Sequence, residues 1–170
     1  HVVINTNANV LDASAATRYP TAAPNITATT LSIRAGDSIG LGDPVNGLPD
    51  QNANAIDIAV QTIAAVATDG AYLEQFSGDL VIGHSNATSF NLAVDQVQFN
   101  STTDPISIDR SSAALDDITV QGPGAAKLVV SGGQLVVMDG LDGDGIGVQT
   151  DSGDLLLQAH TDIIAEASIR

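Results

Sequence analysis

Short apolar runs separated by tight-turn residues constrain the fold of this chain more than any other feature. They are densest in residues 55–83, which read AIDIAVQTIAAVATDGAYLEQFSGDLVIG. Apolar residues recur there mostly at every second position, and Asp-Gly and Ser-Gly-Asp separate the runs. With a period of two, alternate side chains lie on one face of a strand, and Gly and Asp favour the turns between strands. The stretch therefore predicts a series of short β-strands.

The same pattern continues through most of the chain, with strand starts roughly 8 to 12 residues apart. Two stretches rich in Pro, Gly, Asn and Asp, residues 12–25 and 42–54, are predicted as loops. The remaining predicted strands are residues 2–4, 31–35, 38–41, 90–94, 97–99, 106–108, 118–120, 128–130, 135–137, 146–148, 155–159 and 163–169.

Residues 56–67 have two interpretations. Ile56, Val60 and Ile63 also fit helical spacing, and Ala is abundant around them. We interpret the segment as two strands because Asp57 and Ile58 fit a period of two and no helix-capping residue precedes them.

Composition limits both the core and the partners. Aromatic residues are 3% and hydrophobic residues 44%, so a core must consist of small aliphatic side chains, which suits thin stacked layers. The net charge is -15 with five scattered basic residues, which disfavours nucleic acid and anionic membranes as partners. The chain lacks cysteine, which excludes disulfides and thiol catalysis, and it has no apolar run of transmembrane length.

Short segments recur along the chain. Residues 77–80, SGDL, return as residues 152–155, and residues 32–34, SIR, return as residues 168–170. A unit that turns, runs a strand and turns again, repeated without helices, is typical of a solenoid. We therefore expect Leu80, Ile82, Leu155 and Leu157 to point inward on equivalent strands.

Residues 56–83, together with LSIRAGDSIGLG (31–42) and SGDLLLQAHTDIIAEASIR (152–170), resemble the repeats of filamentous-haemagglutinin-like and leukotoxin-type filamentous adhesins of bacteria. The resemblance covers roughly residues 25–170. It implies an all-β, right-handed parallel β-helix, or β-solenoid, whose repeats form the scaffold of an extracellular fibre. We expect residues 1–170 to be a single β-solenoid unit, a section or subunit of a longer fibre. The alternative fold is a β-sandwich repeat module.

Residues 139–145, DGLDGDG, are the best candidate site for chemistry. Ca²⁺ takes six to eight oxygen ligands, and Asp139, Asp142 and Asp144 on a Gly-rich loop can supply several. The run lacks the length and final Glu of an EF-hand loop. The alternative is a solvated turn between Val137 and Ile146, and Asp116-Asp117 is interpreted as a turn entering a strand.

No catalytic constellation is recognisable. His1, His84 and His160 lack a His-x-x-x-His spacing or a nucleophile motif, so we expect them at the surface or in turns. The sparse basic residues disfavour the alternative of a polysaccharide-active β-helix enzyme.

Together with the solenoid pattern, the resemblance implies a structural, non-enzymatic building block of a bacterial filament or adhesin. It would lie outside the cell at the cell surface and assemble head to tail with copies of itself. Host or neighbouring-cell surfaces are further expected partners, and neither nucleic acid nor membrane insertion is expected. A calcium-dependent adhesion module is the alternative, with Ca²⁺ the cofactor considered.

Overall fold

The computed structural model describes residues 1–12, 23–42, 54–97 and 103–170. These residues form strands and turns without a helix, so no helix among them could span a membrane. The strands are β1 (Val2–Thr6), β2 (Ile26–Thr27), β3 (Thr30–Ala35), β4 (Ser38–Ile39), β5 (Ile56–Ala59), β6 (Thr62–Ala67), β7 (Gly70–Gln75), β8 (Leu80–Ile82), β9 (Thr88–Val97), β10 (Thr103–Ser112), β11 (Ile118–Val120), β12 (Ala126–Val130), β13 (Leu135–Val137), β14 (Ile146–Thr150), β15 (Leu155–Ala159), β16 (Ile163–Ala165) and β17 (Ser168–Ile169).

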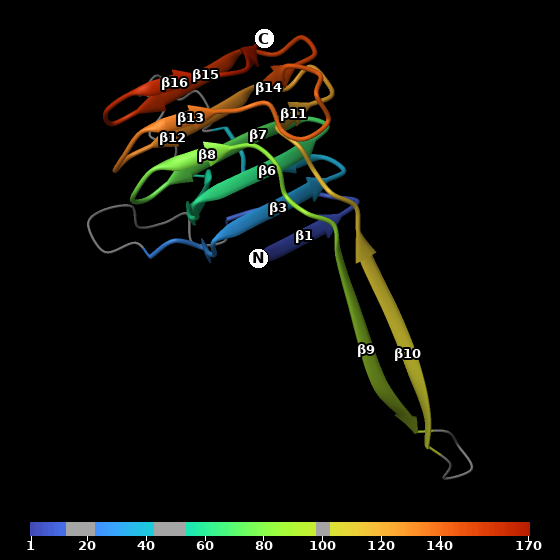
Figure 1. The fold of residues 1–170 in the computed structure, drawn as a ribbon. Coiled ribbons are helices and arrows are strands. Elements are labelled where there is room, and N and C mark those ends of the chain that lie inside the picture. The colour runs from blue at the N-terminus through green and yellow to red at the C-terminus, as the bar shows by residue number, and fades with distance from the viewer. Residues whose placement is uncertain (13–22, 43–53, 98–102) are drawn as a thin grey trace.

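Two parallel sheets make up the body of the molecule (Figure 1). A nine-stranded sheet contains β1, β3, β6, β8, β11, β13, β14, β16 and β17, and a six-stranded sheet contains β2, β4, β5, β7, β12 and β15. The pairings between strands within both sheets are parallel, whereas β9 and β10 form a separate antiparallel pair. This arrangement confirms the all-β, parallel part of the predicted fold class. It does not fit the antiparallel hairpins expected of a sandwich module.

The chain passes back and forth between the two sheets and places each new strand beside an earlier one. Leu31 of β3 lies beside Ile63 of β6, and Ile63 lies beside Ile82 of β8. Ile82 then lies beside Val137 of β13, and Val137 beside Ala165 of β16. We call each such step along the stack a level. β1 lies at one edge of the nine-stranded sheet, and β16 and β17 belong to the last level at the other (Figure 1).

Columns of aliphatic side chains run through the levels and form the core. In the nine-stranded sheet, one column contains Ile33, Ala65, Ile118 and Val148, all 0 to 2% exposed. A second core column, in the six-stranded sheet, contains Ile56, Leu73 and Leu128. Members of both sheets belong to one buried cluster, which explains why a chain with few aromatic residues can exclude water. Alternation places the intervening residues on the opposite face of each strand.

The nine-stranded sheet is interrupted at one position on three successive levels. The unbroken strand β6 pairs with β8 through Thr62 and Ile63, and with β11 through residues 65–67. β8 and β11 therefore act as two halves of one strand, and β13 with β14 and β16 with β17 continue the two halves. We call this break point the insertion slot. It holds residues 83–117, 138–145 and 166–167 on the three levels.

The first insertion contains β9 and β10, which pair along ten residues each and extend away from the two sheets (Figure 1). The predicted strands 90–94 and 97–99 were wrong as separate elements of the stack. Residues 88–97 form one strand of a protruding hairpin, and Phe99 lies outside the described residues. Alternation alone cannot separate a stacked strand from a hairpin strand, because both have a period of two.

The two strands predicted within residues 56–67 are confirmed as β5 and β6, so packing favoured the strand interpretation over the helix. The two SIR segments occupy equivalent places in the nine-stranded sheet, because Ile33 and Ile169 share one column. The expectation that Leu80 and Ile82 lie on strands equivalent to those of Leu155 and Leu157 is wrong. The first SGDL segment precedes β8 in the nine-stranded sheet, and the second precedes β15 in the six-stranded sheet. Most of the two predicted loops lies outside the described residues.

Candidate functional site

The insertion slot brings four carboxylates together. Asp139, Asp142 and Asp144 lie on the second insertion, and Asp117 ends the first insertion one level away. Ligand atoms from the four side chains all lie within 4.8 Å of one another. The predicted group of three is therefore joined by Asp117, which the sequence interpretation had assigned to a strand-entry turn. Three strands, β11, β12 and β13, separate Asp117 from the loop along the chain, so the proximity follows from the stacking of levels.

Backbone N–H groups fix the orientation of each carboxylate. Asp139 Oδ1 accepts a hydrogen bond from Gly145 N (3.2 Å), and Asp144 Oδ1 accepts one from Ile146 N (2.8 Å). Asp142 Oδ1 accepts from Asp144 N (3.3 Å). Asp117 Oδ1 accepts from Gly140 N (3.1 Å), which ties the two insertions together. Gly140 is required at this place because a Cβ there would overlap the Asp116 carboxylate.

Asp117 differs from the other three in burial and charge. It is 4% exposed and has a left-handed backbone with φ of 62°, which Asp tolerates better than most residues. Burial and the negative charges of Asp142, Asp144 and Asp116 together raise the pKa of Asp117 to about 7, and the Gly140 hydrogen bond only partly offsets them. A divalent cation would stabilise the ionised form, because it would neutralise the repulsion among the carboxylates.

His84 and Asp116 form an ion pair at the base of the first insertion. His84 Nδ1 lies 2.8 Å from Asp116 Oδ1, and His84 Nε2 lies 3.1 Å from Asn86 Oδ1. The hydrogen bond to Asp116 raises the pKa of His84 against the effect of burial, because both ring nitrogens face oxygen atoms. Burial raises the pKa of Asp116, but the hydrogen bonds from Leu141 N and His84 together leave it below its usual value. His84 is therefore a partnered side chain rather than an isolated surface residue.

The other two histidines have different surroundings. His1 is exposed, and its ring nitrogens lie 3.1 Å from the hydroxyls of Ser85 and Thr88. His160 is an exposed residue directly after β15. Of the three, only His84 lies beside the carboxylates of the slot, and it contacts Asp116 rather than the group of four.

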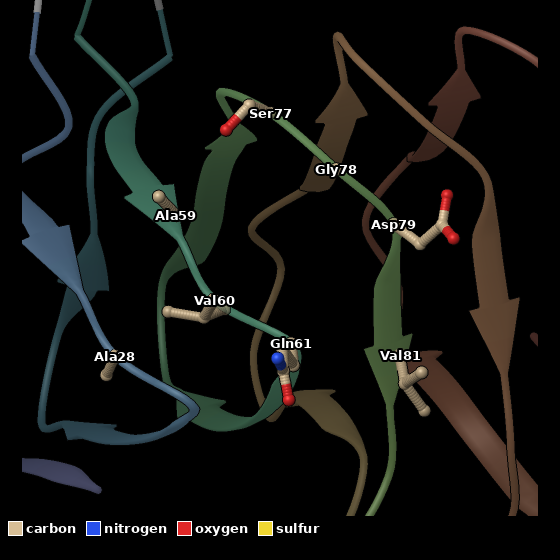
Figure 2. Close-up of a pocket in the computed structure, with 8 residues that line it drawn as sticks. All are labelled: Ala28, Ala59, Val60, Gln61, Ser77, Gly78, Asp79 and Val81. Carbon is tan, nitrogen blue, oxygen red and sulfur yellow. The ribbon is translucent and has the colours of Figure 1, made fainter.

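A groove of about 540 Å³ lies where the chain crosses from the six-stranded to the nine-stranded sheet. Figure 2 shows Ala28 on one side, the turn with Ser77, Gly78 and Asp79 on the other, and residues 59–61 between them. Asp79 is the ionisable side chain among the described residues that line this groove, and its Oδ1 accepts a hydrogen bond from Gln134 N. A second titratable group for acid-base catalysis is absent from the described part of this lining.

Gln75 fixes the shape of this groove from inside the core. It occupies a core column between Ile58 and Val130 and is 1% exposed. Its Nε2 donates to the carbonyls of Val60 (2.7 Å) and Ser77 (2.8 Å), and its Oε1 accepts from Val60 N (3.1 Å). The side chain thus satisfies backbone groups where the wide turn leaves the regular pairing. The sequence analysis missed this role of Gln75, because its position in the alternating pattern predicts only a side chain that points into the core.

No protein family, curated protein or solved structure gives a significant match to the chain. Function must therefore be argued from the geometry of the stack and the slot.

Proposed function

We propose that the chain is a right-handed β-solenoid and a structural building block of an extracellular bacterial filament or adhesin. The observation that carries the proposal is the continuity of the aliphatic columns, which reach the outermost strands of the described sheets. The sequence resemblance, the absence of cysteine and the acidic composition also support it.

The last level leaves an apolar edge uncovered. Leu156, Ile163, Ile164 and Ile169 on β15, β16 and β17 are 38 to 48% exposed. Leu155 and Leu157 are only partly buried, although they continue columns that are fully buried on earlier levels. Parallel edge strands with apolar side chains are templates for pairing with a further strand.

The opposite edge has matching chemistry. Val2 and Ile4 of β1 are partly buried and continue the columns of Leu31 and Ile33. A further level placed against β1 would complete their burial at the usual strand spacing of about 4.8 Å. Either further coils of a longer chain or a second copy can supply that level. Repeated head-to-tail contacts of this kind do not close, so they produce a filament.

Sedimentation velocity of the 170 residues at tens of micromolar tests this proposal. We expect concentration-dependent association that increases with salt, because salt screens repulsion between units of net charge -15. Substitution of Ile164 by Asp should weaken association, whereas Asp162→Asn at the same level should not. A monomer at all concentrations, with protected β1 and β16 amides in hydrogen exchange, would contradict edge pairing.

We further propose that the slot binds Ca²⁺ and thereby stabilises the fold. Four carboxylates within 4.8 Å favour this second role, because Ca²⁺ prefers oxygen ligands and would relieve their repulsion. Asp117 and Asp139 would provide inner ligands, and Asp142 and Asp144 would close the site from the exposed side. Ca²⁺ titration by calorimetry should give heats with the wild type that disappear in the triple variant Asp139→Asn, Asp142→Asn, Asp144→Asn. Equal heats in both proteins would exclude the site.

A further inference from the structure

Asp is followed directly by Gly at four places in the described part of the chain: Asp69-Gly70, Asp139-Gly140, Asp142-Gly143 and Asp144-Gly145. This dipeptide can react within its own chain, because Gly has no side chain to shield the peptide nitrogen that follows the Asp carboxyl group. Three of the four lie in the second insertion, residues 138–145, and share the same dipeptide sequence. Differences in their reactivity must therefore come from the structure around them.

The reaction joins the Asp side chain to the peptide nitrogen of the next residue. That nitrogen attacks the carboxyl carbon Cγ, a C–N bond forms, and one water molecule leaves, made from the carboxyl OH and the amide hydrogen. The product is a five-membered succinimide ring. Water then opens the ring at either carbonyl, which returns the OH to a carboxyl group and the hydrogen to nitrogen. Opening at the backbone carbonyl gives isoaspartate, so the net change is an isomerisation that needs no co-reactant.

Hydrogen bonds of the peptide nitrogen distinguish the three Asp-Gly peptides of the second insertion. Gly140 N donates to Asp117 Oδ1 (3.1 Å), and Gly145 N donates to Asp139 Oδ1 (3.2 Å). Gly143 N has no hydrogen-bond partner among the described residues. The first two nitrogens must break a hydrogen bond before they can attack, whereas Gly143 N has none to lose.

The surroundings of Asp142 also favour the reaction. Asp142 Oδ1 accepts a hydrogen bond from Asp144 N (3.3 Å), which closes a turn that contains the Gly143 nitrogen and holds the carboxyl group beside it. Residues 142 and 143 are exposed, and a Cβ added at Gly143 would meet no heavy atom within 4 Å. A Cβ added at Gly140 would instead overlap the Asp116 carboxylate. The 142–143 peptide therefore has room to rotate, and the 139–140 peptide does not.

Asp69-Gly70 is held by the body of the molecule. Gly70 is buried at the start of β7, where it pairs with Ser38 of β4. A Cβ added at Gly124 would overlap the Asp69 carbonyl, so the backbone of the neighbouring turn packs closely against this peptide. Rotation of the peptide would disturb both contacts, and we expect it to be protected as well.

We propose that Asp142 is the site at which the folded chain isomerises spontaneously to isoaspartate, and that the fold protects Asp69, Asp139 and Asp144. Isoaspartate adds one carbon to the backbone and leaves the carboxylate attached directly to Cα. The carboxylate of residue 142 would thereby leave its place in the group of four. The reaction requires neither a bound cation nor a second copy, so this inference is independent of the proposed function.

Ageing of the purified protein tests the inference. We would incubate it at pH 7 and 37 °C in EDTA, which removes divalent cations, and map isoaspartate by electron-transfer mass spectrometry, whose fragment ions separate Asp142 from Asp144. We expect isoaspartate to form at Asp142 at least tenfold faster than at Asp69, Asp139 or Asp144. Tenfold corresponds to about 1.4 kcal/mol, the order that one hydrogen bond contributes. Equal rates at Asp142 and either of the other two sites in the insertion would overturn the inference.

The same protein in guanidinium chloride is the matched control, because the dipeptides are unchanged and the fold is lost. The four rates should then become similar. A preference for Asp142 that persists there would assign it to local sequence, and conversion at Asp142 only after denaturation would also overturn the inference.

A variant tests the protecting hydrogen bond by itself. Asp139→Ala removes the acceptor of Gly145 N, so isomerisation at Asp144 should rise several-fold relative to Asp142 in the same protein. No rise, in a variant with the circular dichroism spectrum of wild type, would contradict protection by this bond. The wild-type comparison decides the inference whether or not this variant folds.

Discussion

Removal of the first insertion should leave a continuous strand in correct register. Ile82 lies beside Ile63 and Ile118 lies beside Ala65, with a single residue, Ala64, between these two positions of β6. Deleting residues 84–117 joins Gly83 directly to Ile118, so Gly83 would lie opposite Ala64. The joined segment LVIGITV then pairs along β6 without a gap, and Ile82, Ile118 and Val120 keep their inward positions.

The deletion should change stability little because two terms oppose each other. Loss of buried Leu115 costs about 1.5–3 kcal/mol. Removing a closed loop of roughly 34 residues recovers about 3 kcal/mol of closure entropy by (3/2)RT ln n. The net change should fall within about 2 kcal/mol, which corresponds to a shift in Tm of less than about 8 °C for a chain of this size.

The matched control deletes residues 84–116 and retains Asp117. One extra residue shifts the register, so Ile118 and Val120 can no longer both point into the core. At about 1.5–3 kcal/mol for each side chain, this variant should lose roughly 3–6 kcal/mol. Denaturant unfolding followed by circular dichroism would measure both. Equal stability of the two deletions, or loss of cooperative unfolding in the first, would refute the slot as a break in one strand.

Three further outcomes are expected. Gln75→Leu should cost roughly 2–4 kcal/mol because it leaves the Val60 N–H and C=O buried without partners, whereas exposed Gln158→Leu should stay within about 0.5 kcal/mol in the same denaturant assay. Asp117 holds a proton to a higher pH in the folded than in the unfolded chain, so stability should fall as the pH rises from about 4 through 7, by about 4 kcal/mol at most. Asp117→Asn should remove that slope in urea titrations at pH 5 and pH 8, and an unchanged slope would contradict the raised pKa. Leu157→Asp should cost several kcal/mol and open the last level, seen as faster exchange of β15 amides, while wild-type melting would contradict its inward position.

Local sequence was sufficient for the strands of the body. Alternating aliphatic residues with Gly and Asp turns predicted β5 and β6 despite a competing helical spacing. The two SIR segments, noted as a repeat, do occupy one column. Local sequence also predicted the acidic loop as the most promising cation site. These features depend on neighbours a few residues apart, so the chain itself carries the information.

The SGDL segments and the alternating residues of β9 and β10 show what local sequence does not determine. SGDL precedes a strand in both of its copies, but the copies serve different sheets, since a turn does not specify which sheet the next strand joins. Residues 90–94 and 106–108 alternate like the strands of the body, yet they pair with each other outside it. A period of two defines a strand but not its partner.

The sequence by itself determined that this chain forms short strands with an aliphatic inner face and polar turns, because those preferences are local. Only the tertiary structure decided that β8 and β11 are halves of one strand and that Asp117 lies close to Asp139 on the next level. It also decided that the buried Gln75 side chain hydrogen-bonds the backbone of Val60. The physical reason is stacking: each level fixes which distant residues become neighbours, and the energies of burial, charge repulsion and hydrogen bonding depend on those neighbours.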